Sequence, residues 1–304
     1  MCGIAGFLDS TQRHEYASVG RVVLSMLNAL GCRGPDSAGV ALYGLGSNQR
    51  CMLRVKLLDG KGLESSSQQL RELLRSVGVD EHHFSITGSY GRIAINGSID
   101  VEKLIGSIEA LDKEIEVISA GRMLEIIKQV GSPANLESTY GVSRFCGTHG
   151  LGHTRLSTES KVDLSHSQPF WSHQRLDLAV VHNGHITNYH QLRRRYQQRG
   201  IRFYTENDSE IVAVYVADQL GKGHDLEESL ALMLRDLDGS YSCLVATASA
   251  LAFVKDPFSL KPLLFAETGE FVALANEEIA IRTALPGDYQ VREAQAKEVR
   301  IWRK

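Results

Sequence analysis

Four apolar runs of strand length follow one another in the second half of the chain, and their spacing limits the folds that it can adopt. Turn residues separate them, and only two helical segments, Ile211–Leu220 and Leu226–Leu237, interrupt the series. Strands at such short spacing predict antiparallel sheets that pack on each other and are covered by helices. The runs are LDLAVVHNG (176–184, taken to end in an Asn-Gly turn), SYSCLVATA (240–248), ALAFVKD (250–256) and FVALAN (271–276).

The first half of the chain predicts further elements and an insertion. Apolar spacing predicts a helix over Val19–Leu30 that Gly31 ends, followed by a strand over Ala38–Tyr43. Met123, Ile126, Ile127 and Val130 suggest another helix, closed by Gly131 and Pro133. We interpret residues 1–304 as one domain with a small α/β insertion at about 45–148 that has no chemistry of its own.

Composition excludes several classes of protein. The net charge of −3, without a Lys/Arg stripe interleaved with aromatic residues, argues against nucleic acid as a partner. Five scattered cysteines without a C-x-x-C pair argue against a disulfide framework or a structural zinc site and favour a reducing compartment. The first ten residues do not form a signal peptide, and the sequence contains no apolar stretch long enough to span a membrane. We therefore expect a cytoplasmic protein.

Metal and nucleotide sites lack support in the sequence. Eleven histidines include the pairs His149/His153 and His182/His185, but no carboxylate-rich or cysteine-rich ligand set accompanies them. Residues four apart on a strand also do not converge on one ion. No G-x-x-x-x-G-K-[ST] motif, and no G-x-G-x-x-G after a strand, is present. We expect neither a metal nor a cofactor in this chain.

Cys2 is the first candidate for chemistry. A thiol attacks as its thiolate, and the free thiol has a pKa near about 8.5. Removal of Met1 would place the α-amino group of Cys2 beside its own sulfur. That amine, with a pKa near about 7.7–8.0, can act as a general base at neutral pH. Taken alone, a cysteine at this position is more often an inert one, so the interpretation depends on the rest of the chain.

Five further segments follow MCGIAGF in a fixed order. They are RGPDSAG (33–39), GHTRLST (152–158), QPF (168–170), HNGHITNY (182–189) and TENDSE (205–210). With a cysteine at the mature start, this set resembles the class II glutamine amidotransferases, the N-terminal-nucleophile glutaminases. The resemblance covers nearly the whole chain, more loosely in the insertion. It implies an α+β fold, a four-layer αββα sandwich of two antiparallel sheets known as the N-terminal-nucleophile hydrolase fold.

The resemblance assigns two residues to the ends of glutamine. Arg155 matches the family arginine that binds the α-carboxylate, which a guanidinium can do bidentately. Asp208 matches the aspartate that receives the α-ammonium group. The alternatives are a surface arginine for Arg155 and, for Asp208, an N-cap of a helix that starts at Ser209, with Thr205 as a rival cap.

The resemblance also assigns the oxyanion donors and two further contacts. Asn183 and Gly184 stand where the family builds its oxyanion hole from a side-chain amide and a backbone N–H. The alternative is a plain Asn-Gly hairpin turn. Arg33 matches an arginine near the nucleophile, and Thr158 matches a threonine that lines the glutamine pocket; both are assigned as substrate-binding residues.

Departures from the family pattern direct the choice among its members. Cys32 and Glu159 stand where relatives carry histidine, and the spacing between RGPDSAG and GHTR is about twice that of the phosphoribosylpyrophosphate enzyme. The sequence contains no pyrophosphate-binding loop, isomerase half or ATP-pyrophosphatase half. It looks closest to the free-standing glutaminase subunits of archaeal-type glutamate synthase and N-methylglutamate synthase, whose separate synthase subunit is flavin-dependent.

These observations predict a glutaminase subunit. Cys2 would attack the side-chain amide of L-glutamine, form a γ-glutamyl thioester and release ammonia to an ammonia-using synthase subunit. A non-catalytic glutamine sensor or assembly subunit on the same fold is the alternative, and a retained Met1 would favour it. An amidase for another amide is a third possibility, which indifference to changes at Arg155 would reveal.

Overall fold

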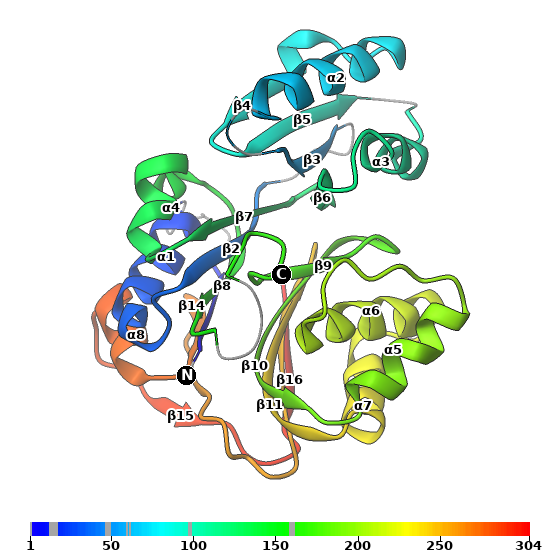
Figure 1. Ribbon diagram of the computed structural model, residues 1–304. Coiled ribbons are helices and arrows are strands. Elements are labelled where there is room, and N and C mark those ends of the chain that lie inside the picture. The colour runs from blue at the N-terminus through cyan, green and yellow to red at the C-terminus, as the bar shows by residue number, and fades with distance from the viewer. Residues whose placement is uncertain are drawn as a thin grey trace.

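The computed structural model describes residues 2–11, 18–45, 50–58, 60, 62–96, 99–157 and 162–304. Two antiparallel sheets form its centre (Figure 1). The seven-stranded sheet has the order β15 (Val291–Glu293), β13 (Leu264–Glu267), β14 (Phe271–Ala275), β1 (Gly3–Asp9), β8 (His149–Arg155), β2 (Ser37–Tyr43), β7 (Leu124–Val130). The five-stranded sheet has the order β16 (Val299–Arg303), β12 (Ala250–Lys255), β11 (Gly239–Thr247), β10 (Arg175–Ile186), β9 (Phe170–Ser172).

The alternation of side chains along β1 explains how the sheets stack. Ile4 and Leu8 belong to the apolar core that the two sheets share, whereas Ala5 and Phe7 belong to the core beneath the helices of the other face. Because successive strand residues point to opposite faces, a strand buried on both sides needs apolar residues at every position. All seven residues of β1 are buried, as this placement requires.

Helices cover the outer face of each sheet (Figure 1). On the seven-stranded sheet lie α1 (Val19–Ala29), α4 (Pro133–Tyr140) and α8 (Glu278–Ala284). On the five-stranded sheet lie α5 (Tyr189–Gln198), α6 (Asp208–Gly221) and α7 (Leu226–Asp236). The predicted four-layer αββα sandwich is therefore confirmed. None of the helices in the described ranges is long and apolar enough to cross a membrane.

A third, four-stranded sheet stands at one end of the sandwich. Its order is β4 (Phe84–Thr87), β5 (Tyr90–Asn96), β3 (Arg50–Lys56), β6 (Glu116–Gly121), and α2 (Gly62–Ser76) and α3 (Val101–Glu109) accompany it. Its apolar side chains continue the core of the two main sheets. Within the range 45–148, β7 pairs with β2 of the seven-stranded sheet and α4 packs on α1. The range predicted as an insertion thus contributes to two layers, and its domain boundary stays a prediction.

The predicted helix over Met123–Val130 is wrong, because these residues form β7. Ile126 belongs to the core between the sheets and Ile127 to the core beneath α1 and α4, so the segment is apolar on both faces. An apolar run buried on two sides cannot be distinguished from a helix by periodicity alone. β-branched Ile126, Ile127 and Val130 favour the strand once a partner strand is available.

Candidate active site

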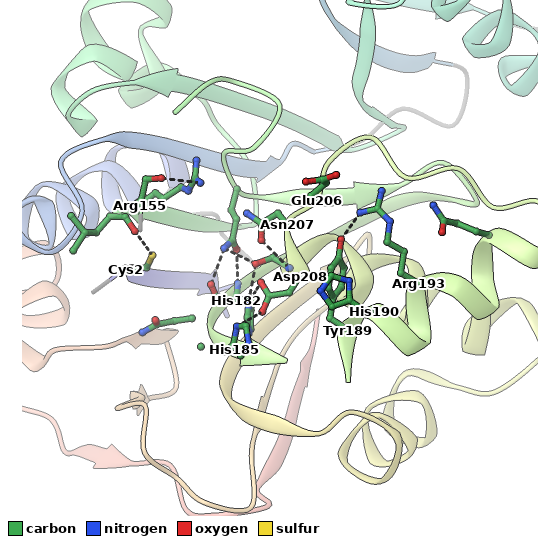
Figure 2. A pocket seen from close by; sticks show the side chains of 17 residues that line it. Cys2, Arg155, His182, His185, Tyr189, His190, Arg193, Glu206, Asn207 and Asp208 are labelled. Atoms are coloured by element: carbon green, nitrogen blue, oxygen red, sulfur yellow. Dashed lines mark hydrogen bonds and ion pairs between the residues drawn. The ribbon is translucent and has the colours of Figure 1, made fainter. Parts of the chain in front are cut away.

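A pocket of about 640 Å³ opens where β1 and β8 of one sheet meet β10 of the other (Figure 2). It brings together five of the seven predicted site residues: Cys2, Arg155, Asn183, Gly184 and Asp208. Thr158 lies outside the described residues. The volume of the pocket falls within the range of about 300–1,000 Å³ typical of small-molecule sites.

Cys2 lies directly before β1 and on the pocket wall. Two residues on, Ile4 faces the core between the sheets, and the period of two directs the side chain of Cys2 toward the same side. Its Sγ lies 3.8 Å from the carbonyl oxygen of Leu156. The thiol is a free one and is partly exposed to the pocket.

Arg33 holds the backbone of Cys2 and does not line the pocket. Its Nε donates to the carbonyl oxygen of Cys2 at 3.3 Å, and its Nη1 forms an ion pair with Glu277. The predicted contact of Arg33 with glutamine therefore stays a prediction. The geometry favours a role in positioning the nucleophile.

Asn276 also anchors the start of β1, and sequence reasoning did not single it out. Its Oδ1 accepts the backbone N–H of Ile4, and its Nδ2 donates to the carbonyl oxygen of Pro262 at 2.9 Å. The side chain is fully buried. None of the family motifs includes Asn276, so the sequence predicted only an apolar strand that ends in this residue.

Asn183 and Gly184 lie within β10, and the predicted Asn-Gly turn is wrong. The strand continues to Ile186, with Asn183 opposite Ser242 and Gly184 opposite Tyr241 in β11. Asn183 has the same parity as Val181, which faces the core between the sheets, so its side chain points toward the layer that contains Cys2. Its Nδ2 is buried and has no hydrogen-bond partner among the described residues.

Gly184 has a backbone that other residues adopt only with strain. Its φ is 149°, and a Cβ atom there would lie 2.1 Å from the carbonyl oxygen of Ser240. A side chain is thus excluded by both conformation and space. This geometry, rather than a turn, explains the glycine.

Arg155 ends β8 with its side chain nearly buried at the pocket. Its guanidinium donates to Ser157 Oγ at 3.3 Å, and the backbone N–H of Ser157 donates to Asp36 Oδ2 at 2.7 Å. Burial lowers the pKa of Arg155, while the acidic groups of Cys2, Asp163 and Asp36 oppose the shift. The predicted alternative of a surface arginine does not apply, because only 4% of the residue is exposed.

Asn207, not Asp208 or Thr205, is the N-cap of α6. Its side chain accepts the backbone N–H of Ser209 at 3.0 Å, and the helix begins at Asp208. The Asp208 carboxylate accepts the backbone N–H of Ile186 at 2.9 Å and remains on the pocket wall. His182 Nδ1 and His185 Nδ1 lie 3.8 and 3.6 Å from its oxygens.

Two buried histidines lie at or near the site: His182 lines the pocket, and His153 lies in β8 two residues before Arg155. Burial lowers the pKa of His182, and it lowers that of His153 to about 3. Both imidazoles are therefore neutral at physiological pH. Among the residues described, no three His, Cys, Asp or Glu side chains are grouped so that they could hold a metal ion.

The outer wall of the pocket contains polar residues that had no predicted role. Tyr189, His190 and Arg193 come from α5, and Glu206 precedes α6 (Figure 2). Tyr189 and Glu206 lie in the segments HNGHITNY and TENDSE, so motif membership alone indicated them.

The chemistry of the inner pocket suits one kind of small molecule. It presents a thiol, a guanidinium, a carboxylate and two potential N–H donors around one cavity. A molecule with a carboxylate, an ammonium group and an uncharged acyl carbon next to the thiol matches all of them.

Comparison with known proteins also indicates chemistry on glutamine. Residues 153–283 match the family model described as "Glutamine amidotransferase domain". A protein of Methanothermobacter thermautotrophicus named as a glutamine amidotransferase is 38% identical over 99% of both chains. Glutamine amidotransferase-like protein GlxB of Rhizobium meliloti is 34% identical over 92% of this chain and 91% of its own.

Longer proteins match over part of their length. An amidophosphoribosyltransferase of Methanothermobacter thermautotrophicus is 32% identical over 59% of this chain but only 36% of its own. The solved glutamine phosphoribosylpyrophosphate amidotransferase from B. subtilis superposes with a TM-score of 0.64 at 19% identity, covering 99% of this chain and 47% of the other. At this identity the likeness shows the fold alone, which is the N-terminal-nucleophile hydrolase fold.

Proposed function

The chain belongs to the class II glutamine amidotransferase family, and we propose that it is a glutaminase subunit acting through Cys2. Members of this family hydrolyse the side-chain amide of glutamine and transfer the ammonia. One observation carries the proposal. Cys2 directly before β1, Asn183 and Gly184 in β10, and the charges of Arg155 and Asp208 line a single cavity.

The first chemical step forms a thioester. Once Met1 is removed, the α-amino group of Cys2 takes the thiol proton, and the sulfur attacks the side-chain carbonyl carbon of glutamine. The carbonyl π electrons move to oxygen and give a tetrahedral oxyanion. Transfer of the proton to the amide nitrogen then lets the C–N bond break, releasing ammonia and leaving a γ-glutamyl thioester. Water hydrolyses the thioester to glutamate and regenerates the thiol.

The oxyanion donors would be Asn183 and Gly184. The buried Nδ2 of Asn183 supports this role, because buried polar groups nearly always have a partner and this one has none within the described ranges. A donor aimed at the oxyanion stabilises the transition state by about 2.7–4 kcal/mol. The Gly184 N–H would be the second donor.

Recognition of free glutamine would use the two charges. Arg155 would bind the α-carboxylate and Asp208 the α-ammonium group. Arg155 ends β8 and Asp208 begins α6, and both line the pocket, so the pocket would distinguish an amino acid from an amide that lacks either charge. Arg33 is proposed to keep the Cys2 backbone in place, and Thr158 to line the pocket.

The ammonia would be used by a separate synthase subunit of the glutamate synthase or N-methylglutamate synthase type. The relative that this chain matches over 99% of both lengths supports a free-standing glutaminase, whereas the amidophosphoribosyltransferase match covers 36% of that enzyme. We propose that this chain holds no cofactor and that the partner subunit holds the flavin.

Turnover by the purified protein, with and without its co-purifying partner, tests the proposal. We expect L-glutamine to yield equimolar glutamate and ammonia, hydroxylamine to trap γ-glutamyl hydroxamate, and intact mass to show that Met1 is absent. Cys2→Ala should abolish all turnover, and Cys32→Ala, which removes an exposed thiol, should not. Turnover by Cys2→Ala at the native rate would rule out the mechanism. Glutamine binding without turnover under both conditions would identify a sensor instead.

A further inference from the structure

We propose that Gln168 is a positioning residue that sets the distance between the oxyanion donors on β10 and the ammonium-binding carboxylate on α6; this rests on the proposed function. Gln168 belongs to the QPF segment, to which neither the resemblance nor the mechanism assigns a role. It is 4% exposed and borders the pocket.

Gln168 contacts the strand through both ends of its amide. Its Oε1 accepts the backbone N–H of His182 at 2.6 Å, and its Nε2 donates to the carbonyl oxygen of the same residue at 2.9 Å. His182 directly precedes Asn183. The pair of bonds therefore fixes the backbone from which the oxyanion donors project.

This contact takes the place of backbone pairing that the sheet lacks opposite His182. Phe170 pairs with Val180 in the antiparallel ladder of β9 and β10, and the same register would bring Gln168 opposite His182. β9 begins only at Phe170, and Pro169 has no N–H to donate. The side-chain amide of Gln168 thus satisfies the donor and the acceptor that a backbone partner would otherwise satisfy.

The same amide reaches the helix. Its Nε2 also donates to Ser209 Oγ at 3.0 Å, and Ser209 Oγ lies 2.8 Å from His182 Nδ1. Because Ser209 Oγ accepts from Gln168, its own proton is available to donate to the neutral His182 ring. Ser209 follows Asp208 in the first turn of α6. One buried side chain therefore connects the residue before Asn183 to the residue after Asp208.

The consequence is a combined effect on binding and chemistry. Without the hydrogen bonds of Gln168, β10 and α6 are held together less firmly, and Asp208 and the oxyanion donors can shift relative to each other. A ligand held at its ammonium end would then present its amide to Cys2 in the wrong place, and misplacement by about 1 Å can cost about 100-fold in rate. Removing Gln168 should thus raise KM and lower kcat together.

Two variants separate this role from simple bulk. Gln168→Met keeps the shape and loses every hydrogen bond, whereas Gln168→Glu keeps the acceptor for His182 N–H and loses both donors. We expect kcat/KM for glutamine to fall at least tenfold in each, with effects on both constants. Gln174→Met, on the exposed connection between β9 and β10, is the matched control and should leave both constants unchanged.

Labelling of Cys2 separates positioning from loss of the nucleophile or the fold. The glutamine analogue 6-diazo-5-oxo-L-norleucine should react with Gln168→Met at least tenfold more slowly than with the native protein, while iodoacetamide reacts at the native rate. Equal slowing of both reagents, or native kinetics in Gln168→Met, would overturn the proposal. If Gln168→Met does not fold, Ser209→Ala removes the hydrogen bond of Gln168 to α6 and should raise KM, and an unchanged KM would overturn the proposal.

A double-mutant cycle tests the coupling to Asp208. If Gln168 acts through α6, the combined loss of kcat/KM in Gln168→Met with Asp208→Asn should be smaller than the product of the single losses. Multiplicative losses contradict the coupling. Absence of turnover by the native protein would contradict the proposed function instead, and the weakening of glutamine binding by Gln168→Met, measured by calorimetry, would still test the inference.

Discussion

The Asp208 carboxylate accepts the backbone N–H of Ile186 at 2.9 Å, and this bond joins the first turn of α6 to the strand that contains Asn183 and Gly184. The side chain can take this position because Asn207 caps the helix. With 17% of the side chain exposed, the carboxylate keeps one face toward the pocket. A residue that could have been only a helix cap is thus available to bind a cation.

Asp208→Asn should raise the KM for glutamine. The amide oxygen can still accept from Ile186 N–H, but the ion pair with the α-ammonium group is lost. A hydrogen bond to a charged group contributes about 1.5–3 kcal/mol, so kcat/KM should fall by about 10- to 100-fold. Steady-state kinetics measures the change, and urea unfolding should show nearly native stability.

Asp225→Asn is the matched control for this variant. Asp225 caps α7, where its side chain accepts the backbone N–H of Glu228 at 2.8 Å, and asparagine is an equally good cap. We expect native KM and native stability. An unchanged KM in Asp208→Asn would show that Asp208 does not bind the α-ammonium group of glutamine.

Gly184→Ala should damage both stability and catalysis. The new Cβ would meet the Ser240 carbonyl oxygen, 2.1 Å away, at a backbone φ of 149°. Overpacking and backbone strain each cost about 1–3 kcal/mol, and relief of the clash would move the Gly184 N–H that is proposed to bind the oxyanion. We expect a lower free energy of unfolding and a kcat reduced at least tenfold.

Gly106→Ala provides the contrasting substitution. Gly106 lies within α3, and a Cβ atom there meets nothing within 4 Å. Alanine should stabilise this helix by about 0.5–1 kcal/mol and leave kcat unchanged. Native activity in Gly184→Ala would show that the strand adjusts without moving the oxyanion donor.

His149 should make the stability of the protein depend on pH. Its Nε2 donates to the Thr247 carbonyl oxygen at 2.8 Å, its Nδ1 lies 2.9 Å from Thr148 Oγ1, and its ring stacks on Tyr43. Burial lowers the pKa of His149 to about 4. The unfolded chain, with a pKa near about 6.5, therefore binds this proton more readily than the folded one.

It follows that stability is fully present above about pH 6.5 and falls as the pH drops toward 4. The free energy of unfolding falls by about 1.4 kcal/mol per pH unit for one histidine. His153, whose pKa is also lowered by burial, adds a loss of the same sign. Urea unfolding at intervals between pH 7 and pH 4.5 measures the slope. His149→Gln should reduce that slope, and an equal slope in the variant would show that His149 is not responsible.

The local pattern of the sequence determined the main elements and the chemistry at the pocket. Apolar runs of strand length between turn residues are enough to predict antiparallel sheets, because the period of two and the turn chemistry are local properties. Cys2, Arg155, Asn183, Gly184 and Asp208 were named from short motifs whose residue types suit the chemistry of an amide. These five line one pocket in the structure.

Only the tertiary structure decided what depends on contacts between distant segments. The segment around Ile126 is a strand because β2 pairs with it, and Gly184 is held within β10 because Tyr241 lies opposite. Asn207 caps α6, and the Asp208 carboxylate bonds instead to Ile186 N–H, a residue 22 positions away along the chain. Gln168 reached His182 and Ser209, 14 and 41 residues away along the chain, through bonds that no local pattern encodes. The physical reason is that a side chain's role depends on which donors and acceptors the fold brings within about 3 Å.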